Sequence, residues 1–319
     1  IALGLSKGVT RVHCPEIDWR THESLMRLRA QGETNLRFYS MVPLPDWERL
    51  LRQVQEQGWG DDWVRWGGLK ALADGSLGSR SALFQQPYND DRSTRGVRVH
   101  PVRDLLEWTL IADQHNFQVA IHAIGDQATH DVLDIFQTVS DRNGPRDRRF
   151  RMEHAQSLQL ADIGRFKKEN VIASIQPYHA IDDGRWAVRR VGPERLKGTF
   201  AYRSIVDQGA RFCCGSDWPV APLDPFTGIQ AAVLRQTLDG KNPGGWMPEQ
   251  QLTLLQALSG YTTGAAYVGF SENRMGRILP GFLADFVVLD KNIFTIPFEH
   301  INSMSTLSTI VGGKARYTA

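Results

Sequence analysis

Four residues that can bind a metal ion or carry a proton stand where short apolar runs of the chain end. Two imidazoles and a carboxylate are ligands typical of Zn²⁺ and similar divalent ions. A lysine is unusual there because ammonium repels a cation, unless carbamylation turns it into a carboxylate able to bridge two ions. The pattern predicts a site for one or two divalent ions, with zinc expected. The residues and their runs are Lys70 in WVRWGGLKAL, His122 in QVAIHAI, His154 in RFRMEHA and Asp217 in RFCCGSD.

Each of these residues also has an ordinary structural interpretation. A histidine at a strand end is commonly a hydrogen-bonded loop residue, and Asp217 in GSDWP could cap a turn ahead of Pro219. Lys70 could extend its ammonium group to the surface. Coincidence at four strand ends favours a shared site over four separate explanations. His179, in a loop after the run VIASIQP, could reach the same place, and His13 ends the first run.

The elements that must position these residues are short β-rich runs that alternate with helical patterns. Helical stretches such as WERLLRQVQEQG and VRDLLEWTLIADQHN separate the runs. Alternation of this kind predicts a parallel sheet with helices outside it, and runs that are apolar throughout indicate strands buried on both faces. The seven predicted strands cover residues 9–14, 34–42, 63–72, 118–124, 149–155, 171–177 and 211–217.

The strand count favours one α/β architecture over another. A doubly wound sheet should carry a Gly-rich phosphate turn after an early strand. The sequence has none, which also argues against a nicotinamide-dependent oxidoreductase. We therefore predict a TIM-type (β/α)₈ barrel over residues 1–272, truncated at its N-terminus and missing its first strand. Residues 273–319 are predicted to form the C-terminal strands of a small β-sandwich domain. The carboxyl ends of barrel strands meet at one rim, where the four residues would converge.

Composition excludes some classes of partner. The chain has 319 residues, 41% of them hydrophobic, enough for a substantial core. Because 37 Lys and Arg nearly balance 35 Asp and Glu, we expect no nucleic-acid partner. No run is long and apolar enough for a bilayer, so no membrane partner is expected. Three cysteines without a disulfide pattern favour a reducing, cytoplasmic location, although a targeting signal upstream of Ile1 would not be observable.

Six motifs follow one another along the chain: LKALADGSLGSR (69–80), HAIGD (122–126), EHAQ (153–156), GSDWPV (215–220), YTTGAAYVGF (261–270) and GRILPGFLADFVVLD (276–290). Together they resemble the metal-dependent amidohydrolases, specifically the YtcJ-like (amidohydrolase 3) branch. The resemblance runs from about residue 8 to residue 319. It implies that His122 and His154 are the metal histidines of two neighbouring strands. It further implies that Asp217 is the aspartate of the last strand and that Lys70 is the lysine often carbamylated in such enzymes.

The sequence departs from this family in one respect. The family carries a His-x-His pair on its first barrel strand, and the sequence contains no His-x-His. The departure predicts that the chain is truncated and lacks two metal ligands. Its metal site is then expected to be incomplete or empty, and the chain is expected to be inactive alone. Strand edges left unpaired by a missing strand invite pairing with another chain, so self-association as a homodimer is also predicted.

The resemblance implies hydrolysis of a carbon–nitrogen bond, in an amide or related non-peptide small molecule, through a metal-activated water. Asp217 would take a proton from the water and pass it to the leaving nitrogen. The alternative is a catalytically inactive barrel or fragment that acts as a binding or regulatory protein.

The long loop over residues 74–100 could cover the site as a lid. Substrate-binding candidates, each with an ordinary packing role as its alternative, are Arg80, Gln176, Tyr178 and Trp218.

Overall fold

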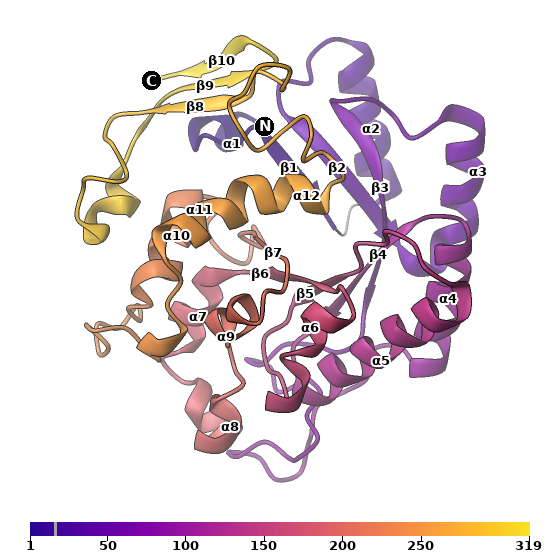
Figure 1. Ribbon diagram of the computed structural model, residues 1–319, viewed down its shortest axis with the longest axis vertical. Coiled ribbons are helices and arrows are strands. Elements are labelled where there is room, and N and C mark those ends of the chain that lie inside the picture. The colour runs from indigo at the N-terminus through magenta and orange to yellow at the C-terminus, as the bar shows by residue number, and fades with distance from the viewer. Residues whose placement is uncertain (16–17) are drawn as a thin grey trace.

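A computed structural model describes residues 1–15 and 18–319, and its central feature is a curled parallel sheet (Figure 1). Within those residues, seven strands hydrogen-bond in sequence order, each parallel to the next. Every predicted run overlaps one of them, which confirms the predicted α/β class and parallel sheet. The strands are β1 (Arg11–Cys14), β2 (Arg37–Pro43), β3 (Val64–Leu72), β4 (Gln118–Ala123), β5 (Arg151–His154), β6 (Ile172–Ile175) and β7 (Phe212–Cys214).

Several helices cover the outside of this sheet and bury an apolar face against it. Helix α5, for example, buries Ala128, Val132, Phe136 and Val139 while its other face is polar. In the part of the chain that the structure describes, no helix is long and apolar enough to span a membrane. The helices are α1 (Ala2–Ser6), α2 (Trp19–Ala30), α3 (Trp47–Gln57), α4 (Val102–Gln114), α5 (Asp126–Asn143), α6 (Arg165–Lys168), α7 (Pro177–Asp183), α8 (Ala187–Leu196), α9 (Tyr202–Asp207), α10 (Pro225–Leu234), α11 (Leu254–Ser259) and α12 (Ala265–Val268).

Helical segments after β7, rather than an eighth strand, lie beside the two edge strands. A π-helix at Gly260–Gly264 continues α11, and a Cβ on Gly264 would lie 2.5 Å from the backbone oxygen of Phe212 on β7. A Cβ on Gly269, just after α12, would lie 3.0 Å from the ring of His13 on β1. Among the described residues the large sheet therefore has seven strands, a half-barrel, and an eight-stranded closure is not present. The predicted homodimer remains a prediction.

The end of the chain forms a second, smaller sheet. It contains β8 (Phe286–Leu289), β9 (Thr306–Val311) and β10 (Lys314–Thr318), paired antiparallel in the order β10-β9-β8. Figure 1 shows this sheet beside α1 and β1, at the end of the molecule where both termini lie. The predicted strands in residues 276–319 are thus present, while the domain boundary after residue 272 remains a prediction.

A buried ion pair joins the two sheets. The Arg37 guanidinium on β2 donates to the Asp285 carboxylate through Nε (2.6 Å) and Nη2 (2.9 Å), and only 3% and 5% of the two side chains are exposed. Asp285 also accepts from the backbone N–H of Gly312 (2.8 Å), in the turn between β9 and β10. Arg37 lies over the ring of Trp63 at 4.4 Å. One carboxylate therefore fixes the small sheet against the large one.

We predict that Asp285→Ala destabilises the protein strongly, because it leaves the Arg37 charge buried without its partner. The expected loss in the free energy of unfolding is about 3–5 kcal/mol, measured by urea titration. The matched control is Arg274→Ala, which removes the exposed bidentate pair between Arg274 and Asp62. Exposed pairs contribute about 1 kcal/mol or less. Equal losses in the two variants would show that the Asp285 pair does not hold the sheets together.

Candidate metal centre

Lys70 faces the inside of the half-barrel because of a bulge in its own strand. Trp66 packs outward, stacking on His22 of α2 with ring centroids 3.3 Å apart. Strict alternation would then send residue 70 outward as well. The pairing of β3 with β2 shifts by one residue at Gly67–Gly68, so Leu69 packs with the outer core and Lys70 turns inward. Lys70 is 5% exposed.

His122 also faces inward, and its ring is held by the loop that follows β3. Ala120, two residues earlier on β4, packs with the inward-facing Tyr39 and Met41. The Nε2 atom of His122 lies 3.0 Å from the carbonyl oxygen of Gly75 and 3.4 Å from a carboxylate oxygen of Asp74. One nitrogen of the ring is therefore engaged by protein groups.

Asp74 is a residue of the site that the sequence analysis did not identify. Its fully buried carboxylate accepts from the backbone N–H groups of Leu83 (2.8 Å), Ile124 (3.0 Å) and Gly125 (2.8 Å). It therefore ties the end of β3 to the end of β4 and to the loop between β3 and α4. This loop, residues 73–101, buries Leu77, Phe84 and other apolar side chains, and its role as a lid remains a prediction. The only signal in the sequence was position, four residues after Lys70.

His154 reaches the same side of the sheet by breaking the alternation of β5. Met152 packs in the outer core, whereas Arg151 and Glu153 form an interior ion pair of 2.8 Å. Residue 154 would point outward in a regular strand. Its backbone instead turns to φ +75°, in the left-handed region that few non-glycine residues adopt. The imidazole then lies against His122, with ring centroids 4.5 Å apart in an edge-to-face arrangement.

The side chains of His154, His179 and Asp217 converge next to the ring of His122. One ligand atom from each lies within 4.8 Å of the others, and His179 Nε2 is 3.7 Å from Asp217 Oδ2. His179 comes from the first turn of α7, whose helix starts at Pro177 rather than continuing the predicted loop. Asp217 follows β7 with φ +61°, a second left-handed residue. Left-handed non-glycine residues cluster at functional sites because the surrounding structure must enforce them.

The electrostatics of the group suit a cation. Burial, followed by the neighbouring His122, His179 and Lys70, holds the pKa of His154 well below its ordinary value. Burial lowers the pKa of His179 to about 4. Both rings are therefore neutral near pH 7, and neutral imidazole is the metal-binding form. Within the described residues, His154 Nδ1 and His179 Nε2 are buried without a hydrogen-bond partner. The donor set His154, His179 and Asp217 therefore fits a divalent ion.

The structure brings two of the four predicted ligands together with a third residue. Among the described residues, His154 and Asp217 form a group with His179. His122 lies beside His154 with Nε2 turned to Gly75, and Lys70 lies on β3. Their roles as ligands remain predictions. His13, the other histidine considered, stacks on Tyr39 and contacts Arg151 Nη1 at 3.3 Å, at the start of the half-barrel.

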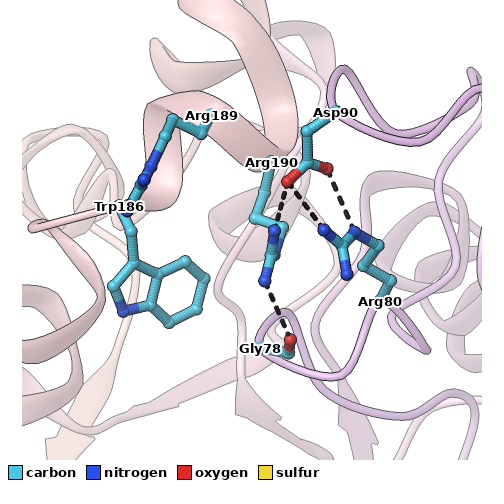
Figure 2. Close-up of a pocket in the computed structure, with 6 residues that line it drawn as sticks. All are labelled: Gly78, Arg80, Asp90, Trp186, Arg189 and Arg190. Atoms are coloured by element: carbon cyan, nitrogen blue, oxygen red, sulfur yellow. Dashed lines mark hydrogen bonds and ion pairs between the residues drawn. The ribbon is translucent and has the colours of Figure 1, made fainter.

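The substrate-binding candidates lie at different depths. Gln176 is buried at the start of α7, where its carbonyl oxygen accepts from the hydroxyl of Tyr202 (3.2 Å). Tyr178 is half-buried, and Trp218 is exposed next to Asp217. Arg80 lies in a separate pocket, where its Nε and Nη2 donate to Asp90 at 3.2 and 3.1 Å (Figure 2). Their roles toward a substrate remain predictions.

We predict that removing either buried imidazole of the His154, His179 and Asp217 group weakens metal binding. His154→Ala and His179→Ala should each lower the affinity of the 319-residue chain for Zn²⁺ by about tenfold or more, because each removes a donor. Titration with Zn²⁺ against a chromophoric chelator measures the affinity. His300→Ala, on the outer η5 turn (Phe298–Ser303), is the matched control and should bind like the unaltered chain. Unchanged affinity in both site variants would contradict the assignment.

A buried carboxyl lies on the same helix as His179, one turn further on. Burial raises the pKa of Asp183 to about 7, and Gln156 Nε2 donates to its Oδ2 at 3.2 Å. The unfolded chain ionises this group near 3.8, so between that pH and about 7 the unfolded state binds fewer protons. Stability contributed by the protonated form is therefore present below pH 3.8 and is lost as pH rises to about 7.

We predict that Asp183→Asn makes the protein more stable than the unaltered chain at pH 8, by about 2–4 kcal/mol, because the buried charge is removed. At pH 4 the two should be nearly equal. Urea titrations at the two pH values measure the difference. A variant that is less stable at pH 8 would mean that the Asp183 carboxylate is favourably bound when ionised.

Two curated relatives match almost the whole chain. It is 37% identical over 325 residues to Protein LONG AFTER FAR-RED 3 of Arabidopsis thaliana, covering 98% of this chain and 55% of the relative. It is 32% identical over 317 residues to the Putative amidohydrolase YtcJ of Bacillus subtilis, covering 98% of this chain and 59% of the relative. The chain therefore spans somewhat more than half the length of each.

The fold and the sequence pattern agree with these relatives. An uncharacterized metal-dependent hydrolase from Pyrococcus furiosus, known by crystal structure, superposes with a TM-score of 0.75 at 30% identity, over 87% of this chain and 55% of that one. The sequence pattern of the amidohydrolase family matches residues 2–317. A match over nearly the whole sequence, together with this fold, confirms the predicted resemblance and shows that the chain belongs to the amidohydrolase family.

Proposed function

We propose that the chain carries the catalytic half-barrel of a metal-dependent hydrolase that cleaves an amide or related carbon–nitrogen bond in a small molecule. The observation that carries the proposal is the group of His154, His179 and Asp217 at the carboxyl ends of the strands. Family membership and the metal-dependent hydrolase of similar fold support a hydrolase. The position supports it further, because active sites of barrel enzymes lie at this rim. No feature of the site specifically favours a purely binding or regulatory protein.

The residues that would hold the metal are His154, His179 and Asp217, with His122 beside them. We propose zinc because two imidazoles and one carboxylate are a common ligand set of catalytic zinc, which keeps a further position open. When bound, the ion would polarise the substrate carbonyl and lower the pKa of a water. Lys70 would join the ligand set only as a carbamate.

Asp217 is the proposed proton carrier. Its side chain is 37% exposed, the most accessible of the three, so it can meet both a water and a substrate. In hydrolysis a water oxygen bonds to the carbonyl carbon, the carbon–nitrogen bond breaks, and the nitrogen gains a proton. The Asp217 carboxylate would receive the proton of the water at one oxygen and return it to the leaving nitrogen.

The neighbouring side chains would bind and orient the substrate. Trp218 is 56% exposed directly after Asp217, so its indole can cover an apolar part of a bound molecule. Tyr178 is half-buried on the first turn of α7, beside His179. These two aromatic side chains would shield a bound substrate from bulk solvent.

We predict that Asp217→Asn lowers turnover about 10²- to 10⁴-fold in the native polypeptide, because it keeps the shape of the side chain but removes the proton carrier. The measurement is a screen of amide and N-acyl substrates with Zn²⁺ present, with metal content determined in parallel. Asp207→Asn, which alters an exposed pair with Arg203, is the control and should be near normal. Near-normal turnover in Asp217→Asn would make Asp217 a structural residue. Turnover that persists after the metal is chelated would contradict the proposed function itself.

A further inference from the structure

A cavity of about 580 Å³ opens between the loop after β3 and helix α8 (Figure 2). The loop and the helix are fixed to one another, because Asn89 N donates to the carbonyl oxygen of Arg190 (2.7 Å) and the Arg195 side chain donates to the carbonyl oxygen of Pro87 (2.9 Å). The walls are therefore formed by two segments far apart in the sequence. The lining residues are Gly78, Arg80, Asp90, Trp186, Arg189 and Arg190.

The cavity carries an excess of positive charge. Three arginines, Arg80, Arg189 and Arg190, line it together with a single carboxylate, that of Asp90. Arg80 and Arg190 both donate to Asp90, whereas the Arg189 side chain extends away from it toward Trp186 (Figure 2). A second carboxylate, Asp91, acts on Arg80 from outside the lining and accepts from Ser93. Three positive charges against two negative ones leave a net positive field, and the walls of the cavity concentrate it.

Arg190 is held ready to bind a planar anion. Its Nη1 donates to Asp90 and its Nη2 lies 3.4 Å from the carbonyl oxygen of Gly78, while the guanidinium lies 5.5 Å from the ring centre of Trp186. These contacts leave further N–H donors on the guanidinium. Figure 2 shows Arg190 between Arg80 and Trp186, with the indole facing it across the cavity. A side chain fixed in advance loses little entropy when it binds.

The cavity lies within reach of the candidate metal centre. Gly75, whose carbonyl oxygen is 3.0 Å from His122 Nε2, precedes Gly78 by three residues, which span about 10 Å at most. On the other side, α8 follows directly after α7, which carries His179. The cavity and the candidate metal centre therefore border the same two segments of the chain, the loop after β3 and the helices α7 and α8.

We propose that this cavity binds a carboxylate at the far end of the substrate, with Arg190 as the fixed contact and Arg189 as a second, exposed cation. Guanidinium and carboxylate match as planar, two-pronged partners, as the pairing of Arg80 with Asp90 already shows. The Trp186 indole would pack against the carbons that link the carboxylate to the amide. The inference rests on the proposed function and adds the substrate class: amides that end in a carboxylate several carbons from the bond to be cleaved.

The test compares two probes that differ only in charge, 6-(benzoylamino)hexanoate and its terminal carboxamide. Binding is measured by calorimetry in an Asp217→Asn background, so that turnover does not intervene. We expect the acid to bind about tenfold or more tightly than the carboxamide, and Arg190→Gln to abolish this preference. Arg189→Gln should reduce it in part, and serves as the second variant if Arg190→Gln does not fold. Arg185→Gln, which alters an Arg185–Asp182 pair outside the cavity, should keep the preference.

The outcomes separate the two proposals. Three results would each overturn the carboxylate site. These are equal affinities for the acid and the carboxamide, no detectable binding of the acid at millimolar concentration, and a preference for the acid that survives both arginine variants. Hydrolysis of neutral amides without any preference for the acid would leave the proposed function standing and remove this inference. A charge preference that depends on Arg190, in a protein that hydrolyses no amide, would leave the binding site standing and remove the proposed function.

Discussion

The site depends on side chains that leave the regular alternation of their strands. In a curled parallel sheet every second residue faces the helices outside. A ligand at the inner rim must therefore occupy one of the inward-facing positions of its strand. His122 occupies such a position, two residues after the inward-facing Ala120. Strict alternation would instead turn Lys70 and His154 outward. A bulge at Gly67–Gly68 turns Lys70 inward, and a left-handed backbone turns His154 inward. Without these two irregularities, one imidazole and the lysine would point into the outer core among apolar side chains.

Such irregularities cost free energy, and the surrounding structure offsets it. A non-glycine residue in the left-handed region costs about 1–3 kcal/mol. Beyond His154, the chain stays fixed because Ser157 N donates to the carbonyl oxygen of Ile124 (2.9 Å). Asp74 fixes the neighbouring strand end by accepting three backbone N–H groups. A buried carboxylate that satisfies three donors at once holds two strand ends and one loop, which makes Asp74 as important to the geometry of the site as any ligand.

The sequence predicted what depends on local pattern and missed what depends on distant contacts. Apolar runs separated by helical periodicity predicted each of the seven parallel strands in the described part of the chain. Position at the strand ends selected His122, His154 and Asp217 as candidates, of which His154 and Asp217 lie in the group with His179. The group formed with His179 was not predicted as such, because the residue sits on a helix that begins at Pro177 rather than in the expected loop. Asp74 was not identified because its role comes from contacts with residues 83, 124 and 125. The pocket of Arg190 joins segments about a hundred residues apart, which no periodicity reveals.

Lys70 is the least expected neighbour of a cation site, and its position shows why its chemical state matters. Its side chain is 5% exposed, and its positive charge is one cause of the lowered pKa of His154. As an ammonium group, Lys70 adds to the burial that keeps the His154 imidazole neutral, which favours metal binding, but it also repels the incoming ion, which opposes binding. As a carbamate, Lys70 would carry a negative charge on its carboxylate oxygens, attract the ion and reverse both effects. The chemical state of this one buried side chain therefore changes how strongly the interior of the half-barrel attracts a divalent metal.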